Sequence, residues 1–282
     1  MTVTIEDNEP QQSDPQPREL IVTLFGLYAR AQSNWLPVAG LVRMMADLGV
    51  DGPAVRSSVS RLKRRDILIS ERHEGAVGYA LSSSALEVIA EGDTRIFHRG
   101  RGTVEDGWII LVFSVPESER DRRHTLRTTL TRLGFGTVAP GVWIAPGRLA
   151  RETREMLERK GLSAYAELFD GQHLAFGDLR SKVRRWWDLE GLTLQYAEFV
   201  RRHRPTLAEF GARAAPPEQA FAAYVPMLTE WRRLPYLDPG LPLSLLPAGW
   251  HGVTAEQLFN DLNDTLSGPA REHAVQVIHR RR

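Results

Sequence analysis

The sequence predicts an α+β protein in which a short tail precedes three folded parts. Three observations support this prediction: helical spacing followed by alternating strands near the N-terminus, alternation of strands and helices in the middle, and helical spacing toward the C-terminus. A chain of 282 residues can hold one large domain or two to three small ones, since domains usually have roughly 100–200 residues. We predict a tail at 1–17 and folded parts at 18–99, 105–176 and 177–282.

The tail and the composition limit the class of protein. The first 17 residues contain four acids, three prolines and no base, which is typical of disorder. They lack the pattern of a secretory signal, and no apolar run approaches the roughly 20 residues that cross a bilayer. The chain has no cysteine, which excludes disulfides and thiolate chemistry. We therefore expect a cytoplasmic protein that has no membrane partner.

Helices and a hairpin are predicted in the first folded part. Apolar residues recur at helical spacing over 17–31 and 38–48, and Asp51 or Gly52 can cap a third helix. Residues 67–81, ILISERHEGAVGYAL, alternate as strand, turn and strand, and a further helix follows. Three helices followed by a hairpin are the elements of a winged helix-turn-helix, in which the second helix of the motif enters the major groove of DNA.

The third helix has a basic face. The net charge is only +1, but GPAVRSSVSRLKRRDIL places five cations between Arg56 and Arg65 without an acid. Apolar residues from Val55 to Leu62 share the opposite side. Arginine can bind a guanine edge, whereas contacts to phosphate are largely indifferent to sequence. We predict a DNA-binding surface formed by base-reading Ser57, Ser60, Arg61 and Arg64, by phosphate-binding Arg56, Lys63 and Arg65, and by Arg72 and His73 of the hairpin.

Two interpretations without DNA binding stay open for these residues. A run of cations taken alone is more often a solvated helix face, and only the neighbouring helix and hairpin favour DNA binding here. Arg72 and His73 could equally be ordinary polar residues of a hairpin tip.

The middle part alternates strands with helices. WIILVFSV at 108–115 is typical of a buried strand, and a helix with inward leucines follows through Leu133. Two short strands, FGTVA and GVWIA, flank Pro140–Gly141. A helix and the strand SAYAELF complete the order βαββαβ, which is that of the ferredoxin-like fold.

The last part is predicted to be helical. Asp178 can cap a helix that ends at Trp186–Trp187, and further helices are expected over 189–210 and over 216–234. The proline-rich connector PYLDPGLPLSLLPAGWHG is predicted to be irregular. Thr254 and Gln257 then predict a capping box that opens the last helix.

No motif predicts catalysis, a metal or a cofactor. The histidines lack the H-E-x-x-H spacing, and the serines lack the G-x-S-x-G turn. We predict a protein that is not an enzyme. An alternative is a nucleic-acid-processing enzyme that uses the ferredoxin-like part, although the sequence shows no cluster of carboxylates at its strand ends. A second alternative is a DNA-binding regulator without a small-molecule effector.

Several stretches resemble the PaaX family of bacterial transcriptional repressors. They are PRELIVTLFGLY, VRSSVSRLKRRDIL, FSVPESER, LGFGTVAPGVWIAP, WDLEGL and WRRLPYLDPGLPLSLLPAGWHG, and the likeness covers about residues 17 to 278. It implies a homodimeric repressor of aromatic-acid (phenylacetate-type) catabolic genes that an aryl-acyl-CoA, such as phenylacetyl-CoA, releases from its operator. The family's middle domain is similar to the CRISPR-adaptation nuclease subunit, but Phe113, Ser114 and Val115 stand where that nuclease has an acid. The difference argues against nuclease activity.

An acyl-CoA effector would need cations for its phosphates and an apolar slot for its acyl group. Arginines lie near aromatic residues in the last folded part, although buried aromatics and solvated arginines are the commoner explanation of such a pattern. The candidate effector-binding residues are Arg184, Arg185, Trp187, Arg201, Arg202, Trp231, Arg232 and Arg233.

Overall fold

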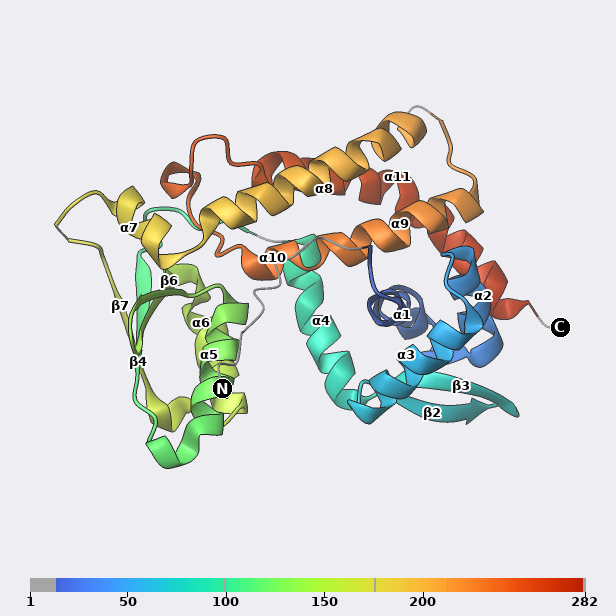
Figure 1. Cartoon of the computed structure of the whole chain (residues 1–282), viewed down its shortest axis with the longest axis horizontal. Coiled ribbons are helices and arrows are strands. Elements are labelled where there is room, and N and C mark those ends of the chain that lie inside the picture. Colours follow the sequence, from blue (N-terminus) through green and yellow to red (C-terminus); the bar gives the residue numbers. More distant parts are fainter. Residues whose placement is uncertain (1–13, 99, 175, 212, 281–282) are drawn as a thin grey trace, which may run out of the picture. The chain divides into compact units, whose positions relative to one another are not determined.

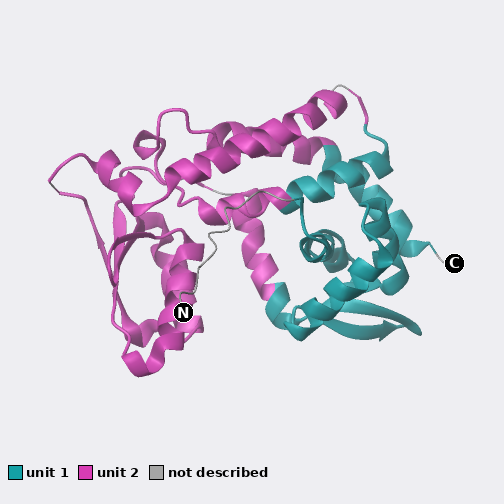
Figure 2. Ribbon diagram, viewed as in Figure 1, with its two compact units in different colours: residues 1–86, 215–229, 266–282 teal, residues 87–214, 230–265 magenta. Residues whose placement is uncertain are grey.

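The computed structural model describes residues 14–98, 100–174, 176–211 and 213–280, and shows a mixed α+β protein (Figure 1). Most of the predicted disordered tail, residues 1–13, lies outside the described residues. The chain divides into two compact units (Figure 2). Unit 1 lies within Met1–Leu86, Ala215–Thr229 and Leu266–Arg282, and unit 2 within Glu87–Ala214 and Glu230–Thr265.

Unit 1 contains the predicted helices and hairpin. A π-helical turn and a 3-10 turn, Phe25–Ala29 and Arg30–Gln32, follow its first helix. Its elements from the first helix to the hairpin are α1 (Pro17–Leu24), β1 (Trp35–Pro37), α2 (Val38–Asp47), α3 (Gly52–Arg64), β2 (Leu68–His73) and β3 (Ala76–Leu81).

The strands of unit 1 form one antiparallel sheet in the order β1-β3-β2. Strand β1 was not among the predicted elements, because three residues that include a proline carry little strand signal. Gly78 makes the pairing possible, since a Cβ atom there would lie 2.3 Å from the Trp35 ring and 2.4 Å from the Leu36 carbonyl oxygen. The sheet closes over a core that includes Leu36, Leu68 and Leu81.

Parts of the C-terminal helices belong to unit 1. Helices α9 (Pro217–Trp231) and α11 (Gly252–His279) each begin in one unit and end in the other. The Phe221 ring stacks on Tyr28 of the N-terminal helical segment, with 6.0 Å between the centroids. Arg43 of α2 donates a hydrogen bond to the Arg280 carbonyl oxygen at 3.0 Å. The compact units therefore combine segments that lie far apart in sequence, because apolar and polar contacts join them.

Unit 2 contains a four-stranded antiparallel sheet. Its strands lie in the order β5-β6-β4-β7, and its elements follow the predicted succession β, α, β, β, α, β. The last strand begins later than predicted because Ser163–Tyr165 form a 3-10 turn. The elements are β4 (Trp108–Phe113), α5 (Arg120–Leu133), β5 (Gly136–Ala139), β6 (Val142–Pro146), α6 (Ala150–Arg159) and β7 (Ala166–Gly171).

The other helices of unit 2 include α7 (Leu179–Trp186), α8 (Leu189–Phe210) and the end of α4 (Ser83–Phe97). Asp178 caps α7 as predicted, by accepting a hydrogen bond from Ser181 N at 2.9 Å. One core of unit 2 includes Leu126 and Trp143, and a second core includes Trp108 and Val183.

Two predictions for the C-terminal part were wrong. The connector is not wholly irregular, because Leu234–Leu237 form the short helix α10 and Leu243–Leu245 form a 3-10 turn. The last helix begins at Gly252 rather than at Thr254, since Ala255 N already bonds to the His251 carbonyl oxygen at 2.9 Å.

Candidate nucleic-acid interface

Helix α3 presents its cations to solvent. Asp51 fixes the start of the helix by accepting a hydrogen bond from Ala54 N at 2.7 Å, and Pro53 occupies its first turn. Val55, Val59 and Leu62 are buried, so the opposite face points outward. The predicted residues Arg56, Ser57, Ser60, Arg61, Lys63, Arg64 and Arg65 are all exposed.

The charge on this face is not neutralised by the fold. Within the residues that the structure describes, none of the five cations from Arg56 to Arg65 forms an ion pair, and Lys63 lies 6.0 Å from the centre of the Tyr79 ring. Three of the cations occupy the last helical turn, where the helix dipole favours positive charge. The face is therefore available to a polyanion.

The two hairpin residues predicted to contact DNA, Arg72 and His73, have different surroundings. Glu74 and Gly75 both have positive φ, as a tight two-residue hairpin turn requires. Arg72 is exposed. His73 is engaged by its neighbours: its ring stacks on Trp35 at 4.7 Å between centroids, and its Nε2 lies 3.1 Å from Glu71 Oε2. Arg72 is thus the freer of the two side chains for contact with a partner.

The end of α3 is tied to the start of α4. The Ser82 hydroxyl donates to the Asp66 carbonyl oxygen at 2.6 Å and accepts from Ala85 N at 3.2 Å. Ser82 N also bonds to the Ile67 carbonyl oxygen at 3.1 Å. One serine therefore caps α4 and holds the segment that leaves α3.

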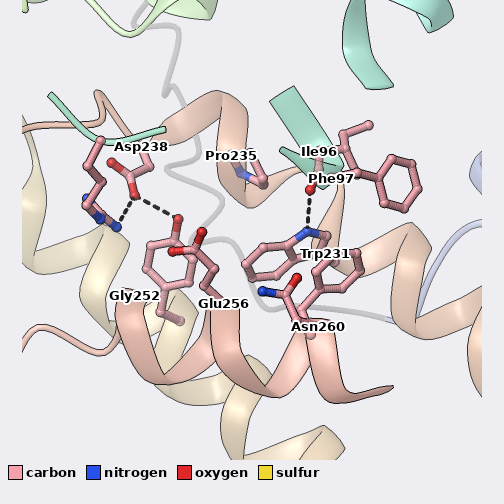
Figure 3. A pocket seen from close by; sticks show the side chains of 11 residues that line it. Ile96, Phe97, Trp231, Pro235, Asp238, Gly252, Glu256 and Asn260 are labelled. Carbon is pink, nitrogen blue, oxygen red and sulfur yellow. Dashed lines mark hydrogen bonds and ion pairs between the residues drawn. The ribbon is translucent and has the colours of Figure 1, made fainter. Parts of the chain in front are cut away.

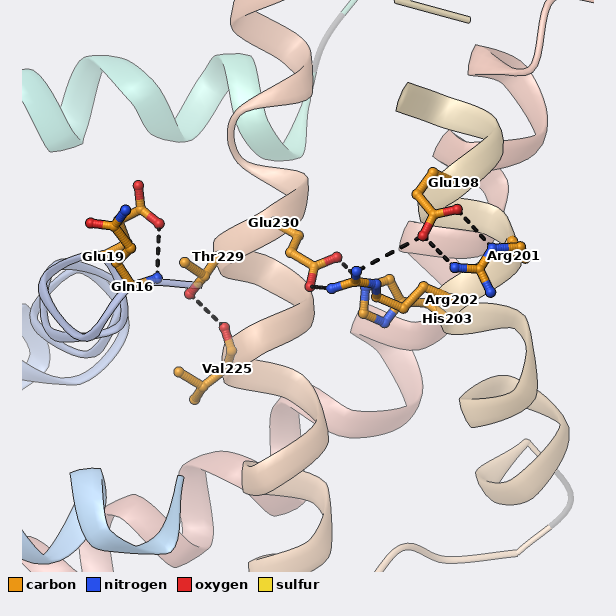
Figure 4. A network of polar contacts seen from close by, with 9 residues as sticks. All are labelled: Gln16, Glu19, Glu198, Arg201, Arg202, His203, Val225, Thr229 and Glu230. Atoms are coloured by element: carbon orange, nitrogen blue, oxygen red, sulfur yellow. Dashed lines mark hydrogen bonds and ion pairs between the residues drawn. The ribbon is translucent and has the colours of Figure 1, made fainter. Parts of the chain in front are cut away.

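The predicted effector residues do not meet in one site. Arg201 forms an ion pair with Glu198, and Arg202 binds Glu230 at 2.9 Å (Figure 4). Trp187 is buried and donates to the Gly134 carbonyl oxygen at 2.9 Å. Arg184, Arg185 and Arg233 are exposed, and Arg232 is half-buried. The expected residues therefore divide into buried aromatics, two partly buried arginines (Arg202 and Arg232) and arginines exposed to solvent.

Trp231 lines a small pocket (Figure 3). Its indole N–H donates to the Ile96 carbonyl oxygen at 3.1 Å, and its ring stacks on Phe259 at 4.5 Å. Asp238 lines the same pocket, is fully buried and accepts from Arg101 at 3.0 Å. The cavity measures about 20 Å³, which is room for one water molecule and far too little for an acyl-CoA.

A larger groove lies between α4 and α6. It measures about 280 Å³, and all its lining residues belong to unit 2. Sequence reasoning missed it because its two sides are distant in sequence and α6 alternates acids with bases like an ordinary solvated helix. The charged residues that line it are Glu91, Arg95, His98, Arg148, Arg151, Glu152, Glu155 and Arg159.

The described residues offer neither a metal site nor a membrane span. Among the described residues, no group of three or more histidines and acids is arranged to hold a metal ion. The described helices are each too short or too polar to span a bilayer.

Comparison with known proteins identifies relatives over most of the chain. Three family models match consecutive segments: "PaaX-like protein" at 16–85, "PaaX protein central Cas2-like domain" at 101–183 and "PaaX-like protein C-terminal domain" at 187–276. The Transcriptional repressor PaaX of Escherichia coli (strain K12) is 28% identical over 249 residues, which are 85% of this chain and 77% of that protein.

A solved structure supports the fold. The uncharacterized protein Rv0674 from Mycobacterium tuberculosis matches with a TM-score of 0.57 and 23% identity, over 90% of this chain and 97% of that one. At this identity the likeness concerns the fold alone.

Proposed function

Since the chain belongs to the PaaX family, we propose that it is a transcriptional repressor that binds double-stranded DNA. The observation that carries the proposal is the exposed, unpaired basic face of α3, which follows α2 and precedes a hairpin. The elements α1 to β3 then act as a winged helix-turn-helix, with α3 in the major groove.

Two kinds of contact are proposed for α3. Ser57, Ser60, Arg61 and Arg64 read base edges, and Arg56, Lys63 and Arg65 hold phosphates. Arg72 of the hairpin reaches the DNA backbone. His73 contributes less, because Trp35 and Glu71 already engage its ring.

The sheet of unit 2 is proposed to be a ferredoxin-like domain without catalysis. Its strand order and element succession support that fold. A nucleic-acid-processing enzyme is the second candidate function, because the matching family model describes a Cas2-like domain. Ser114 and Val115 follow β4, so no carboxylate stands at the end of that strand, which favours the repressor.

We also propose how the repressor is controlled. Two copies bind a two-fold symmetric operator of aromatic-acid catabolic genes, and an aryl-acyl-CoA such as phenylacetyl-CoA releases them. A ligand can do this only if it binds one conformation better than the other. A regulator without a small-molecule effector is the alternative. As a bacterial DNA-binding protein, the repressor would act in the cytoplasm.

Fluorescence anisotropy tests the function directly. The chain is titrated at fixed salt onto labelled DNA from upstream of its own gene and of neighbouring operons, with and without phenylacetyl-CoA. Sequence-dependent binding that phenylacetyl-CoA abolishes, and that free CoA and phenylacetate leave intact, is the expected result. Specific DNA binding that phenylacetyl-CoA does not change would contradict the proposed effector and would still support the proposed repressor. Absence of specific binding to any such DNA would contradict the proposed repressor and favour the alternative of a nucleic-acid-processing enzyme.

A further inference from the structure

The groove between α4 and α6 is lined by more cations than acids. Four arginines and one histidine face three glutamates: Arg95, His98, Arg148, Arg151 and Arg159 against Glu91, Glu152 and Glu155. Its volume of about 280 Å³ is close to the lower end of ligand pockets, which span roughly 300–1,000 Å³. Leu149 and Met156 add apolar surface. The groove thus suits the phosphorylated part of a ligand better than a wholly apolar one.

Three ion pairs at the groove can exchange partners. Arg159 pairs with Glu91 at 2.5 Å, and both side chains are about half exposed (50% and 45%). Arg95 lies 3.7 Å from Glu152, with 12% of the Arg95 side chain and 50% of the Glu152 side chain exposed. The Arg151–Glu155 pair is longer still, at 4.0 Å. Because the carboxylate of each pair is exposed to solvent and such pairs contribute little, a phosphate that offers several acceptor oxygens can replace these carboxylates.

Arg95, which lies beside Glu152 in the groove, also anchors α4. Arg95 donates to the carbonyl oxygens of Arg132 and Leu133 at 2.8 and 2.9 Å, at the end of α5. Its guanidinium lies 5.2 Å from the centre of the Tyr236 ring. At the other end of α4, Ser82 holds the segment that leaves α3. A ligand in this groove therefore touches the helix that continues from the proposed DNA-reading elements.

We propose that this groove binds the phosphate-bearing part of a CoA thioester, with Arg148, Arg151 and Arg159 as phosphate ligands. Ligand phosphates displace Glu91 and Glu152 from Arg159 and Arg95, which loosens α4 and lowers the affinity for DNA. The inference rests on the proposed function, since it names the site of the effector proposed there.

Isothermal titration of the full chain with phenylacetyl-CoA tests the site. Arg148→Ala/Arg151→Ala is the groove variant, and Arg151 is 90% exposed, so its loss does not threaten the fold. The matched control is Arg154→Ala, an exposed arginine of α6 outside the groove. We expect a rise in Kd of about tenfold or more for the groove variant, since charge-assisted hydrogen bonds are lost, and an unchanged Kd for the control.

The outcomes separate the site from the effector. If the groove variant binds phenylacetyl-CoA as tightly as the wild-type chain does, the proposed site is wrong, and the effector proposal still stands. No binding of phenylacetyl-CoA by the wild-type chain would overturn both. An equal loss in the groove variant and in Arg154→Ala would reveal attraction by surface charge alone and would also overturn the site.

A second variant tests the exchange of ion-pair partners, and it is expected to tighten ligand binding rather than weaken it. Glu152→Gln removes a carboxylate that competes with the ligand, so phenylacetyl-CoA should bind more tightly by a few-fold. Glu158→Gln, an exposed acid of α6 outside the groove, should change the affinity less. By linkage, operator DNA should weaken ligand binding by the same factor by which the ligand weakens DNA binding. Weaker or unchanged ligand binding by Glu152→Gln would contradict the exchange.

Discussion

Arg61 and Arg65 lie close together but are proposed to do different work. Arg61 projects from the exposed face of α3, and Arg65 directly follows the helix. Arg61→Ala should cost about 1–3 kcal/mol on the operator and relax the preference for one base pair. Arg65→Ala should weaken binding to all DNA alike and reduce the salt slope by about 1. Anisotropy titrations on operator and scrambled DNA at several salt concentrations measure both effects. Equal, sequence-blind losses would contradict the base-reading role of Arg61.

Glu230 ties α9 to α8 by an ion pair whose strength depends on pH. Burial alone would raise the pKa of its carboxyl group, but hydrogen bonds and charge from His203 and Arg202 outweigh burial and hold the pKa below its ordinary value. The stabilisation is therefore complete above the ordinary glutamate pKa and is lost as the pH falls through the lowered one. Glu230→Gln should cost about 1.5–3 kcal/mol at neutral pH.

Urea unfolding at about pH 7 and about pH 3.5 measures this dependence, because the low pH lies below the ordinary glutamate pKa. The gap in stability between wild type and Glu230→Gln should narrow at the lower pH. Glu209→Gln is the control in α8, since Glu209 pairs with Arg213 at an exposed site (54% and 61% exposed) and contributes little. A gap that stays constant with pH would refute the ion-pair explanation.

Single residues were predictable where chemistry is local. Asp51 was one of the two expected caps of α3, and it could be recognised because its side chain needs only the next turn of its own helix. The engagement of His73 by Trp35 was not predictable, since the stacking partner lies on a strand that the sequence did not indicate.

Strand β1 depends on the absence of a side chain in β3. Gly78→Ala would place a methyl group against the Leu36 carbonyl oxygen and the Trp35 ring, and the backbone oxygen cannot move aside without breaking the pairing. We expect a loss of about 1–3 kcal/mol in stability. Gly268→Ala, in α11 of the same unit, meets nothing within 4 Å and should stabilise by about 0.5–1 kcal/mol. Urea unfolding compares the two. Similar effects of both substitutions would contradict the close contact at Gly78.

Long periodic elements were predictable, and short or proline-bearing ones were not. Helices α3 and α8 were expected from their apolar spacing. Helix α10 has four residues and begins beside a proline, so its sequence looks like a loop, although Leu234 and Pro235 are buried. Its helical turn depends on the core around it, which a local pattern cannot show.

The division of the molecule was the hardest property to predict. The α+β composition follows from periodicity, but only the folded chain shows that 215–229 and 266–280 group with the described residues up to Leu86. The contact of His273 with Asp47 at 2.8 Å joins residues 226 positions apart. The groove and the small pocket likewise combine distant segments, whereas the basic face lies within one helix and was therefore visible in the sequence.

The number of copies on the operator is a property of the whole assembly. A single winged helix-turn-helix makes few base contacts, so two copies on a palindrome are expected for tight, specific binding. Sedimentation velocity of the chain with operator DNA should give two protomers for each duplex. A duplex with one half-site scrambled is the control and should bind far more weakly. One protomer per duplex at full affinity would contradict the dimer.

Helix α4 is held at both ends, so a tilt about one end displaces the other end. Its 15 residues correspond to a rod about 22 Å long at 1.5 Å per residue. A tilt of about 10° about the end held by Arg95 would move the Ser82 end by about 4 Å, which is close to the 3.4 Å step between successive base pairs. In the proposed repressor, a small displacement of the groove wall would then suffice to shift α3 out of register with the base pairs that it is proposed to read.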